Sequence, residues 1–132
     1  MTNINPVDLV LLVEDSLIDV FIHTKVLEQL SLAKQIKSCP NALSALSYLE
    51  SLESADEIPS LIFLDIRMPD LDGFEFLERF NNLSEAVKQK SKIVMLSSSI
   101  DSSDLEKARS NKYVLAFIPK PLTKEKVEEL FG

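Results

Sequence analysis

The chain has 132 residues, of which 45% are hydrophobic and 27% charged, as in ordinary globular domains. Its apolar runs fall short of the roughly 18 residues of a membrane span, its start lacks a signal segment, and its single cysteine, Cys39, cannot form an internal disulfide. The net charge of -7 disfavours binding to nucleic acid or anionic lipid, which need a positive surface. We therefore expect one soluble cytoplasmic domain over residues 1–132, without an output domain, that acts on protein partners.

The first part of the chain alternates between strand and helix patterns. Val7–Val13 is apolar except at Asp8, which predicts a buried strand, and a short strand is expected over Ala33–Ser38. Ser16 is suited to cap a helix between these two strands. The apolar residues of that helix recur at every fourth position and predict the face that packs on a sheet: Ile18, Ile22, Val26 and Leu30, with Phe21 beside them. A second helical stripe follows at Ala42, Ala45, Leu46 and Leu49.

The stretch that follows places one carboxylate at the end of a buried strand. Leu61–Leu64 is an unbroken apolar run, too short for a helix, and predicts a strand covered on both faces with Asp65 at its carboxyl end. Pro69 cannot continue a strand or a helix, and Gly73 tolerates the backbone angles of a sharp turn, so a loop is expected between them. This loop should hold Asp65 at an open edge.

A third helix is marked by Phe74, Leu77 and Phe80. The polar stretch 81–92 then leads to a fourth strand, Ile93–Leu96, which ends at Ser97. These two elements repeat the helix-then-strand order of the first part of the chain.

A fourth helix is expected to start near Ser103, with Glu106 in capping-box spacing, and to run to about Asn111. Its inward residues are predicted to be Leu105 and Ala108. A fifth strand, Val114–Ile118, comes next. Thr123 then caps a last helix, for which the predicted buried residues are Val127, Leu130 and Phe131.

Strands that alternate with helices in this way predict a parallel sheet with helices on both faces, which binds ligands beyond the carboxyl ends of its strands. The residues that follow those ends are Glu14, Asp15, Asp65, Ser97 and Lys120. Crowded carboxylates are tolerated beside a divalent cation, and an all-oxygen set favours Mg²⁺. A metal together with a nucleophilic Asp, a Lys and a Ser indicates phosphoryl chemistry.

With these residues in place, the chain resembles the receiver domains of response regulators in two-component signalling over essentially its full length. The motifs that carry the resemblance are Glu14-Asp15, the run from Asp65 through Pro69 to Gly73, Ser97, and Lys120-Pro121. The resemblance implies an α/β fold of the flavodoxin-like doubly wound (βα)5 type, with a five-stranded parallel sheet in the order 2-1-3-4-5.

The resemblance also implies a metal site. Asp15 and Asp65 are expected to bind Mg²⁺ directly together with the Arg67 carbonyl, and Glu14 is expected to act largely through water. Glu14 stands at a position where Asp is common in the family.

Around the phosphoryl group, the resemblance implies that Lys120 and Ser97 contact the oxygens and that the Lys120–Pro121 bond is cis. Phe117 occupies the aromatic switch position, where Tyr is frequent. Arg67 and Ser99 should flank the route of an attacking water, and the Arg67 guanidinium is expected to reach the phosphoryl oxygens or to pair with Glu14. The residues expected to line the phosphoryl site are Arg67, Ser98, Ser99, Phe117 and Pro121.

The function implied is a phosphorylatable switch, with no chemistry beyond its own phosphorylation and dephosphorylation. A sensor histidine kinase or a phosphotransfer protein is expected to supply the phosphoryl group to Asp65. The fourth helix, fifth strand and fifth helix should then form the output face for an unidentified partner or for a second copy of the chain. Lysines make that face basic: Lys107, Lys112, Lys124 and Lys126.

Other functions fit less well. A haloacid-dehalogenase-type phosphatase also uses a strand-end Asp and Mg²⁺, but it needs a second Asp two residues on, where this chain has Arg67. A flavodoxin-like cofactor binder would need a phosphate-binding loop where Glu14 and Asp15 stand. A phosphohistidine carrier would need an exposed histidine on a helical bundle, and the single histidine, His23, lies in an alternating strand and helix pattern.

Overall fold

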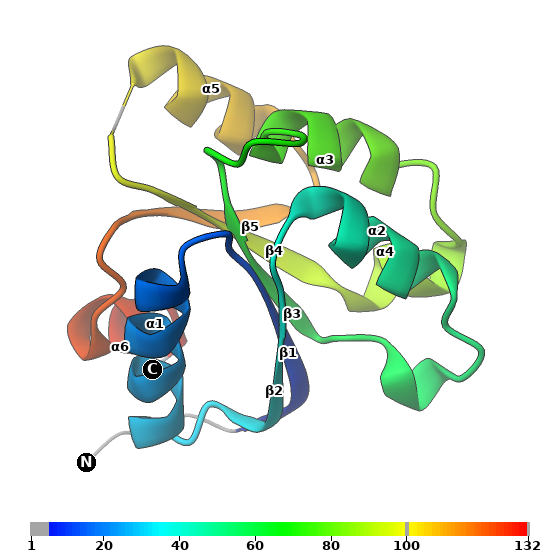
Figure 1. The fold of residues 1–132 in the computed structure, drawn as a ribbon. Helices are drawn as coiled ribbons and strands as arrows, with labels where there is room; N and C mark the ends of the chain where they lie inside the picture. Colours follow the sequence, from blue (N-terminus) through cyan, green and yellow to red (C-terminus); the bar gives the residue numbers. More distant parts are fainter. Residues whose placement is uncertain (1–5, 100, 132) are drawn as a thin grey trace.

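A computed structural model describes residues 6–99 and 101–131 of the chain (Figure 1). Five parallel strands form one sheet in the order β2-β1-β3-β4-β5, which confirms the predicted flavodoxin-like fold. The strands are β1 (Val7–Val13), β2 (Ala33–Cys39), β3 (Leu61–Asp65), β4 (Lys92–Ser97) and β5 (Val114–Pro119).

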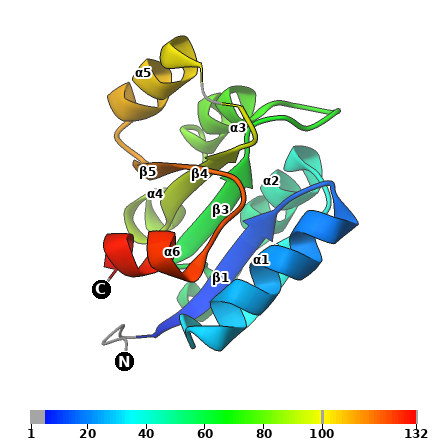
Figure 2. The same cartoon turned by 90° about the vertical axis from the view of Figure 1, so that its left-hand side faces the viewer.

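Helices cover both faces of the sheet, as Figures 1 and 2 show. One face packs against α1 (Leu17–Gln29) and α6 (Lys124–Phe131). The other face is covered by α2 (Ala42–Glu50), α3 (Gly73–Phe80), α4 (Glu85–Lys90) and α5 (Ser102–Ser110), while η1 (Ala55–Glu57) is a single 3₁₀ turn. Every helix that the structure describes is too short or too polar to cross a membrane.

The helix α4 was not predicted, because it lies in the stretch that the sequence pattern assigns to a polar connection. It has six residues, Ser84 caps its first turn, and only Val87 is buried against the core. So few apolar positions carry no detectable helical period. The helices predicted as the fourth and fifth are therefore α5 and α6.

The predicted sheet-facing stripe of α1 is correct at Val26 and Leu30, which pack on the core, and wrong at Ile18, Phe21 and Ile22. The buried residues of α1 are His23 and Leu27, whereas Ile18 is 72% exposed and Phe21 is 64% exposed. A helix has 3.6 residues per turn, so a strict repeat of four drifts by about 40° at each step and leaves one face. The inward face follows alternating steps of three and four, and the polar His23 hides that pattern in the sequence.

The start and the inward face of α5 also differ from the prediction. Asp101, rather than Ser103, caps the helix: its carboxylate accepts a hydrogen bond from the Ser103 N–H at 2.7 Å. Asp104 and Ala108 are buried and Leu105 is half-buried. An inward Asp could not be predicted from an apolar period, because Asp104 forms an ion pair with the distant Arg67.

Gly73 is required for space rather than for its backbone angles. No glycine in the described residues has a positive φ. A Cβ on Gly73 would lie 2.9 Å from Met95 Cε and 3.0 Å from Ile66 Cα, closer than side chains normally pack. The Gly73 N–H also donates to the Ile66 carbonyl at 2.8 Å, which closes the loop after Asp65. This glycine therefore lets α3 begin directly against β3.

Candidate functional site

The candidate site lies at the carboxyl ends of the strands, around the switch point between β1 and β3. The chain runs from β1 outward to β2 and then returns to the other side of β1 as β3. Val13 pairs with Leu64, so Glu14 and Asp65 leave neighbouring strands at the same level. Open parallel sheets bind ligands at such a point.

Lys120 gathers three carboxylates around its ammonium group. Its Nζ lies 2.8 Å from Glu14 Oε2, 2.9 Å from Asp19 Oδ2 and 3.1 Å from Asp65 Oδ2. Burial by itself lowers the pKa of Lys120, but these contacts outweigh it and raise the pKa above its ordinary value. The lysine is therefore charged and positioned beside the Asp65 carboxylate.

Asp19 was not identified by sequence reasoning. It lies in the first turn of α1, four residues after Asp15, where the helix N-terminus favours any acid. Only the fold brings it to Lys120, which lies 101 residues further along the chain. The available signal was its i, i+4 spacing from Asp15.

Three of the predicted site residues can together hold a cation. Glu14, Asp15 and Asp65 each offer one oxygen, and these oxygens lie within 4.8 Å of one another. Glu14 Oε2 is buried and accepts no hydrogen bond within the described structure, although the Lys120 ammonium lies close to it. Burial is the main reason that the pKa of Glu14 is raised to about 7, and the neighbouring Asp65 adds to the shift. This all-oxygen, under-compensated group fits Mg²⁺.

Asp65 is more covered than the open edge that the sequence predicted. Its side chain is 5% exposed, because Lys120 lies against Oδ2 while Oδ1 accepts a hydrogen bond from the Arg67 N–H at 3.2 Å. The backbone does end its strand at the sheet edge, as predicted. Asp15, in contrast, is exposed and lies on the solvent side of the carboxylate group.

The Arg67 side chain points to α5. Its Nη2 lies 3.2 Å from Asp104 Oδ2, with 60% of the arginine side chain and 12% of the aspartate side chain exposed. The expected pairing of Arg67 with Glu14 is therefore not formed in this structure. Asp104 is a further residue that sequence reasoning missed, since nothing local relates it to a residue 37 positions earlier.

The Ser97 hydroxyl forms its hydrogen bonds with the backbone of Ser99, within the turn that follows β4. Its Oγ donates to the Ser99 carbonyl at 2.6 Å and accepts from the Ser99 N–H at 3.2 Å. Ser97 is fully buried, whereas Ser98 and Ser99 are exposed. The turn is tied to the Lys120 loop, because the Lys120 N–H donates to the Ser97 carbonyl at 2.7 Å.

Two features implied by the resemblance concern the chain around Lys120. The Lys120–Pro121 bond is cis, as expected. Phe117 is half-buried and packs against the core cluster beneath α2 and α3.

His23 is buried in α1, so it is not a surface phosphohistidine. Its Nε2 accepts from the Leu122 N–H at 3.4 Å, and burial together with the nearby Lys120 charge lowers its pKa. This neutral imidazole packs α1 against the loop after Pro121.

Comparisons with known proteins agree with this geometry. The sequence model of the family described as "Response regulator receiver domain" matches residues 10–131. A relative described as the probable methanogenesis regulatory protein FilR2 of Methanothrix harundinacea is 32% identical over 127 residues, which covers 92% of this chain and 80% of the relative.

Solved structures resemble the whole chain as well. A response regulator receiver protein from Dyadobacter fermentans is 36% identical, with a TM-score of 0.81 over 92% of this chain and 93% of the other. A two-component response regulator from Cytophaga hutchinsonii is 32% identical, with a TM-score of 0.88 over 96% of both chains.

Proposed function

Since the chain belongs to the response regulator receiver domains of two-component signalling, we propose that it is a phosphorylatable switch whose acceptor is Asp65. The observation that carries this proposal is the position of the Lys120 ammonium, 3.1 Å from an Asp65 oxygen and beside a carboxylate group suited to Mg²⁺. All the residues that this chemistry needs come from one five-stranded domain.

In the proposed reaction, an Asp65 oxygen attacks the phosphorus of a phosphohistidine on a sensor kinase or phosphotransfer protein. The phosphorus–nitrogen bond breaks, and the imidazole leaves with the electron pair and takes up a proton. Lys120 stabilises charge on the phosphoryl oxygens from its position beside Asp65. The Ser97 hydroxyl must leave the Ser99 carbonyl before it can donate to the same group.

Asp15, Asp65 and the Arg67 carbonyl would hold the Mg²⁺ directly, with Glu14 acting through water. The ion supplies positive charge to the phosphoryl oxygens when it is bound. Lys120 already neutralises part of the carboxylate charge, so the buried oxygens remain compatible with the fold before a cation binds.

The exposed apolar face of α1 is the surface that we assign to the phosphodonor. The large exposed residues of this helix are Leu17, Ile18, Phe21 and Ile22, with exposed fractions of 83%, 72%, 64% and 40%. Large exposed apolar patches mark interaction sites, and this one begins two residues after Asp15. A partner docked there would reach Asp65 past the exposed Asp15.

The output signal is proposed to pass through Ser97 and Phe117 to α5, β5 and α6. Ser97 ends β4, and its neighbour in the sheet is the carboxyl end of β5, which carries Phe117. Reorientation of the Ser97 hydroxyl breaks its hydrogen bonds to Ser99 and opens the turn. We expect the half-buried Phe117 ring to repack in response. The face that results would bind an output protein or a second copy.

The acceptor is tested by incubating the protein with acetyl phosphate and Mg²⁺ and measuring hydroxylamine-labile phosphate. Wild type and Asp56→Asn, which removes an exposed carboxylate of η1, should both become labelled, and Asp65→Asn should not. Labelling of Asp65→Asn at the wild-type rate would refute the assignment. Continuous release of phosphate from p-nitrophenyl phosphate would favour the phosphatase alternative instead.

A further inference from the structure

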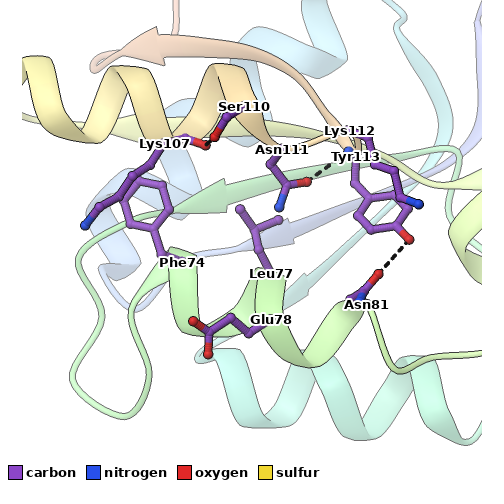
Figure 3. Close-up of a pocket in the computed structure, with 9 residues that line it drawn as sticks. All are labelled: Phe74, Leu77, Glu78, Asn81, Lys107, Ser110, Asn111, Lys112 and Tyr113. Carbon is purple, nitrogen blue, oxygen red and sulfur yellow. Dashed lines mark hydrogen bonds between the residues drawn. The ribbon is translucent and has the colours of Figure 1, made fainter.

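A groove runs between α3 and the segment that joins α5 to β5 (Figure 3). Its volume of about 550 Å³ lies in the range of ligand-binding pockets. Figure 3 shows Leu77 on its floor between Phe74 and Tyr113, with lysines from the α5 side at its rim. Its lining includes Phe74, Leu77, Glu78, Lys107, Lys112 and Tyr113.

Two lysines of the groove lie over aromatic rings instead of beside carboxylates. Lys107 Nζ is 5.3 Å from the centroid of the Phe74 ring, and Lys112 Nζ is 5.2 Å from that of Tyr113. Within residues 6–99 and 101–131, neither ammonium forms an ion pair. Glu78 is the one acidic residue among the lining residues that the structure describes. The lining thus has two lysines and one acid, and Glu85 outside the lining also interacts with the charge of Lys112. The groove therefore has a small positive charge, on a protein that is acidic as a whole.

The structure divides the basic area that the sequence predicted. Lys126 Nζ donates to the carbonyls of Pro119 and Pro121, at 2.8 Å each, so its charge is already used to hold the loop after β5. Lys107 and Lys112 instead line the groove, while the exposed Arg109 of α5 lies outside it. Two of the four predicted lysines therefore belong to the groove.

The walls of the groove are held by contacts behind them. The Tyr113 hydroxyl donates to Asn81 Oδ1 at 2.9 Å. The Tyr113 ring packs edge-on against the Phe80 ring, with 5.1 Å between the ring centroids. The Asn111 side chain accepts from the Tyr113 N–H at 2.9 Å. A ligand would therefore bind a formed site and lose little free energy to ordering it.

We propose that the α3–α5 groove binds an acidic peptide segment of the output partner. An apolar side chain of that segment packs between the half-buried rings of Phe74 and Tyr113, above the buried Leu77, and flanking carboxylates pair with Lys107 and Lys112. The net charge of -7 repels an acidic partner elsewhere on the surface, which restricts binding to this groove. The binding of an acidic peptide is independent of the proposed function. The statement that this peptide belongs to the output partner rests on it.

The groove is connected to the phosphoacceptor through the Arg67–Asp104 ion pair. Arg67 follows Asp65 by two residues, and Asp104 belongs to α5, which forms one wall of the groove. A phosphoryl group on Asp65 competes with Asp104 for the guanidinium, because it carries more negative charge. Loss of this pair loosens α5 at its N-terminal end, so peptide affinity should differ between the two states.

The test uses a library of random dodecapeptides displayed on phage, selected on the wild-type protein with and without a beryllofluoride phosphate mimic. Counter-selection uses Lys107→Glu/Lys112→Glu. Enriched peptides should contain acidic residues around a Leu, Phe or Trp. As labelled synthetic peptides, they should bind wild type at least about tenfold more tightly than the groove variant in fluorescence anisotropy.

The matched control is Lys37→Glu/Lys92→Glu. It changes the charge equally at two exposed lysines, and Lys37 also lies over a ring, at 4.9 Å from the Tyr48 centroid, but neither residue lines the groove. This variant should bind the peptides as wild type does. If thermal melting shows that Lys107→Glu/Lys112→Glu is unfolded, Lys107→Gln/Lys112→Gln replaces it, with an expected loss of several-fold.

Three results would overturn the proposal: no enrichment over the groove variant, enriched peptides without acidic residues, or equal binding by both variants. Self-association in sedimentation that the groove variant abolishes, without peptide binding, would assign the groove to a second copy instead. Labelling by acetyl phosphate is measured on the same samples. Labelling without peptide binding rejects the groove alone, and peptide binding without labelling rejects the phosphoacceptor function alone.

Discussion

The central strands of the sheet and β5, one of its two edge strands, are packed very differently. Phe63 in β3 is completely buried, whereas Leu115 in β5 is 47% exposed and Phe117 is half-buried. The pairing of β4 with β5 also shifts register between Ile93 and Val94, so that the edge strand is irregular. The sheet thus combines a tightly covered centre with a loosely covered edge.

We expect this difference in packing to give the two parts of the sheet different roles in the proposed switch. Glu14 follows β1 and Asp65 ends β3, and neither strand can move without opening the core, so the carboxylate geometry is fixed by packing. Phe117 and Lys120 belong to, or follow, a strand with less buried surface, which can shift at lower cost in free energy. The central strands hold the proposed acceptor Asp65, and the β5 edge carries the elements expected to respond to its phosphorylation.

The comparison predicts its largest effect for matched substitutions in the two strands. Phe63→Ala should lower the free energy of unfolding by about 3–5 kcal/mol, because it leaves a cavity in the closed core. Phe117→Ala should lower it by about 1 kcal/mol, since the ring is only partly removed from water. Urea unfolding of both variants measures the difference, and equal losses would show that the edge is packed as tightly as the centre.

Lys120 lies where edge and centre meet, and its removal should have the next largest effect. Lys120→Ala should slow acyl phosphate formation by about 100-fold, because the Asp65 site loses a positioned positive charge. Lys124→Ala removes an exposed lysine of α6 and serves as the control. Rates of acetyl phosphate labelling measure the effect, and a change in Lys120→Ala no larger than in the control would exclude the role.

The centre should also be sensitive to pH through Glu14. Its pKa is raised from 4.5 to about 7, so between these values the folded protein holds a proton that the unfolded chain releases. Stability without a cation should therefore fall as pH rises over this interval, and Glu14→Gln should remove that dependence. Melting temperatures measured between pH 4.5 and 7 in a chelating buffer compare wild type with Glu14→Gln.

Protonation of Glu14 should also weaken the binding of Mg²⁺. Mg²⁺ affinity should rise as pH increases through about 7, because binding needs the Glu14 carboxylate. Asp15→Asn should weaken binding at every pH and by more than Glu14→Gln, since a direct ligand contributes more than one acting through water. Isothermal titration measures the affinities, and unchanged affinity in Asp15→Asn would contradict this assignment.

The smallest effect is expected for the Arg67–Asp104 ion pair, which joins the loop after Asp65 to α5. Arg67→Ala should hydrolyse its acyl phosphate a few-fold faster if the guanidinium shields the phosphoryl group. Asp104→Asn should do the opposite, because it frees Arg67 to move toward Asp65. Decay after removal of the donor measures both, with the double variant expected to match Arg67→Ala. Slower decay in Arg67→Ala would mean that the guanidinium stabilises the transition state instead.

The sequence alone was sufficient for the fold and for the residues at the strand ends. Four consecutive apolar residues before Asp65 report a strand buried on both faces, and the same is true of Val10–Val13 before Glu14. Burial of this kind is visible locally, because a covered strand must be apolar at every position. The parallel order then brings the strand ends to one edge whatever the details of packing.

Only the tertiary structure determined which face of α1 is buried and which ion pairs the charged side chains form. The inward position of His23 and the outward position of Phe21 depend on the packing of the helix on the sheet, and the apolar pattern permitted either face. Ion pairs depend on distances of about 3 Å between residues far apart in the chain, such as Lys120 with Asp19 or Arg67 with Asp104. A charged side chain has several possible partners in a sequence, and the backbone arrangement determines which of them lies within reach.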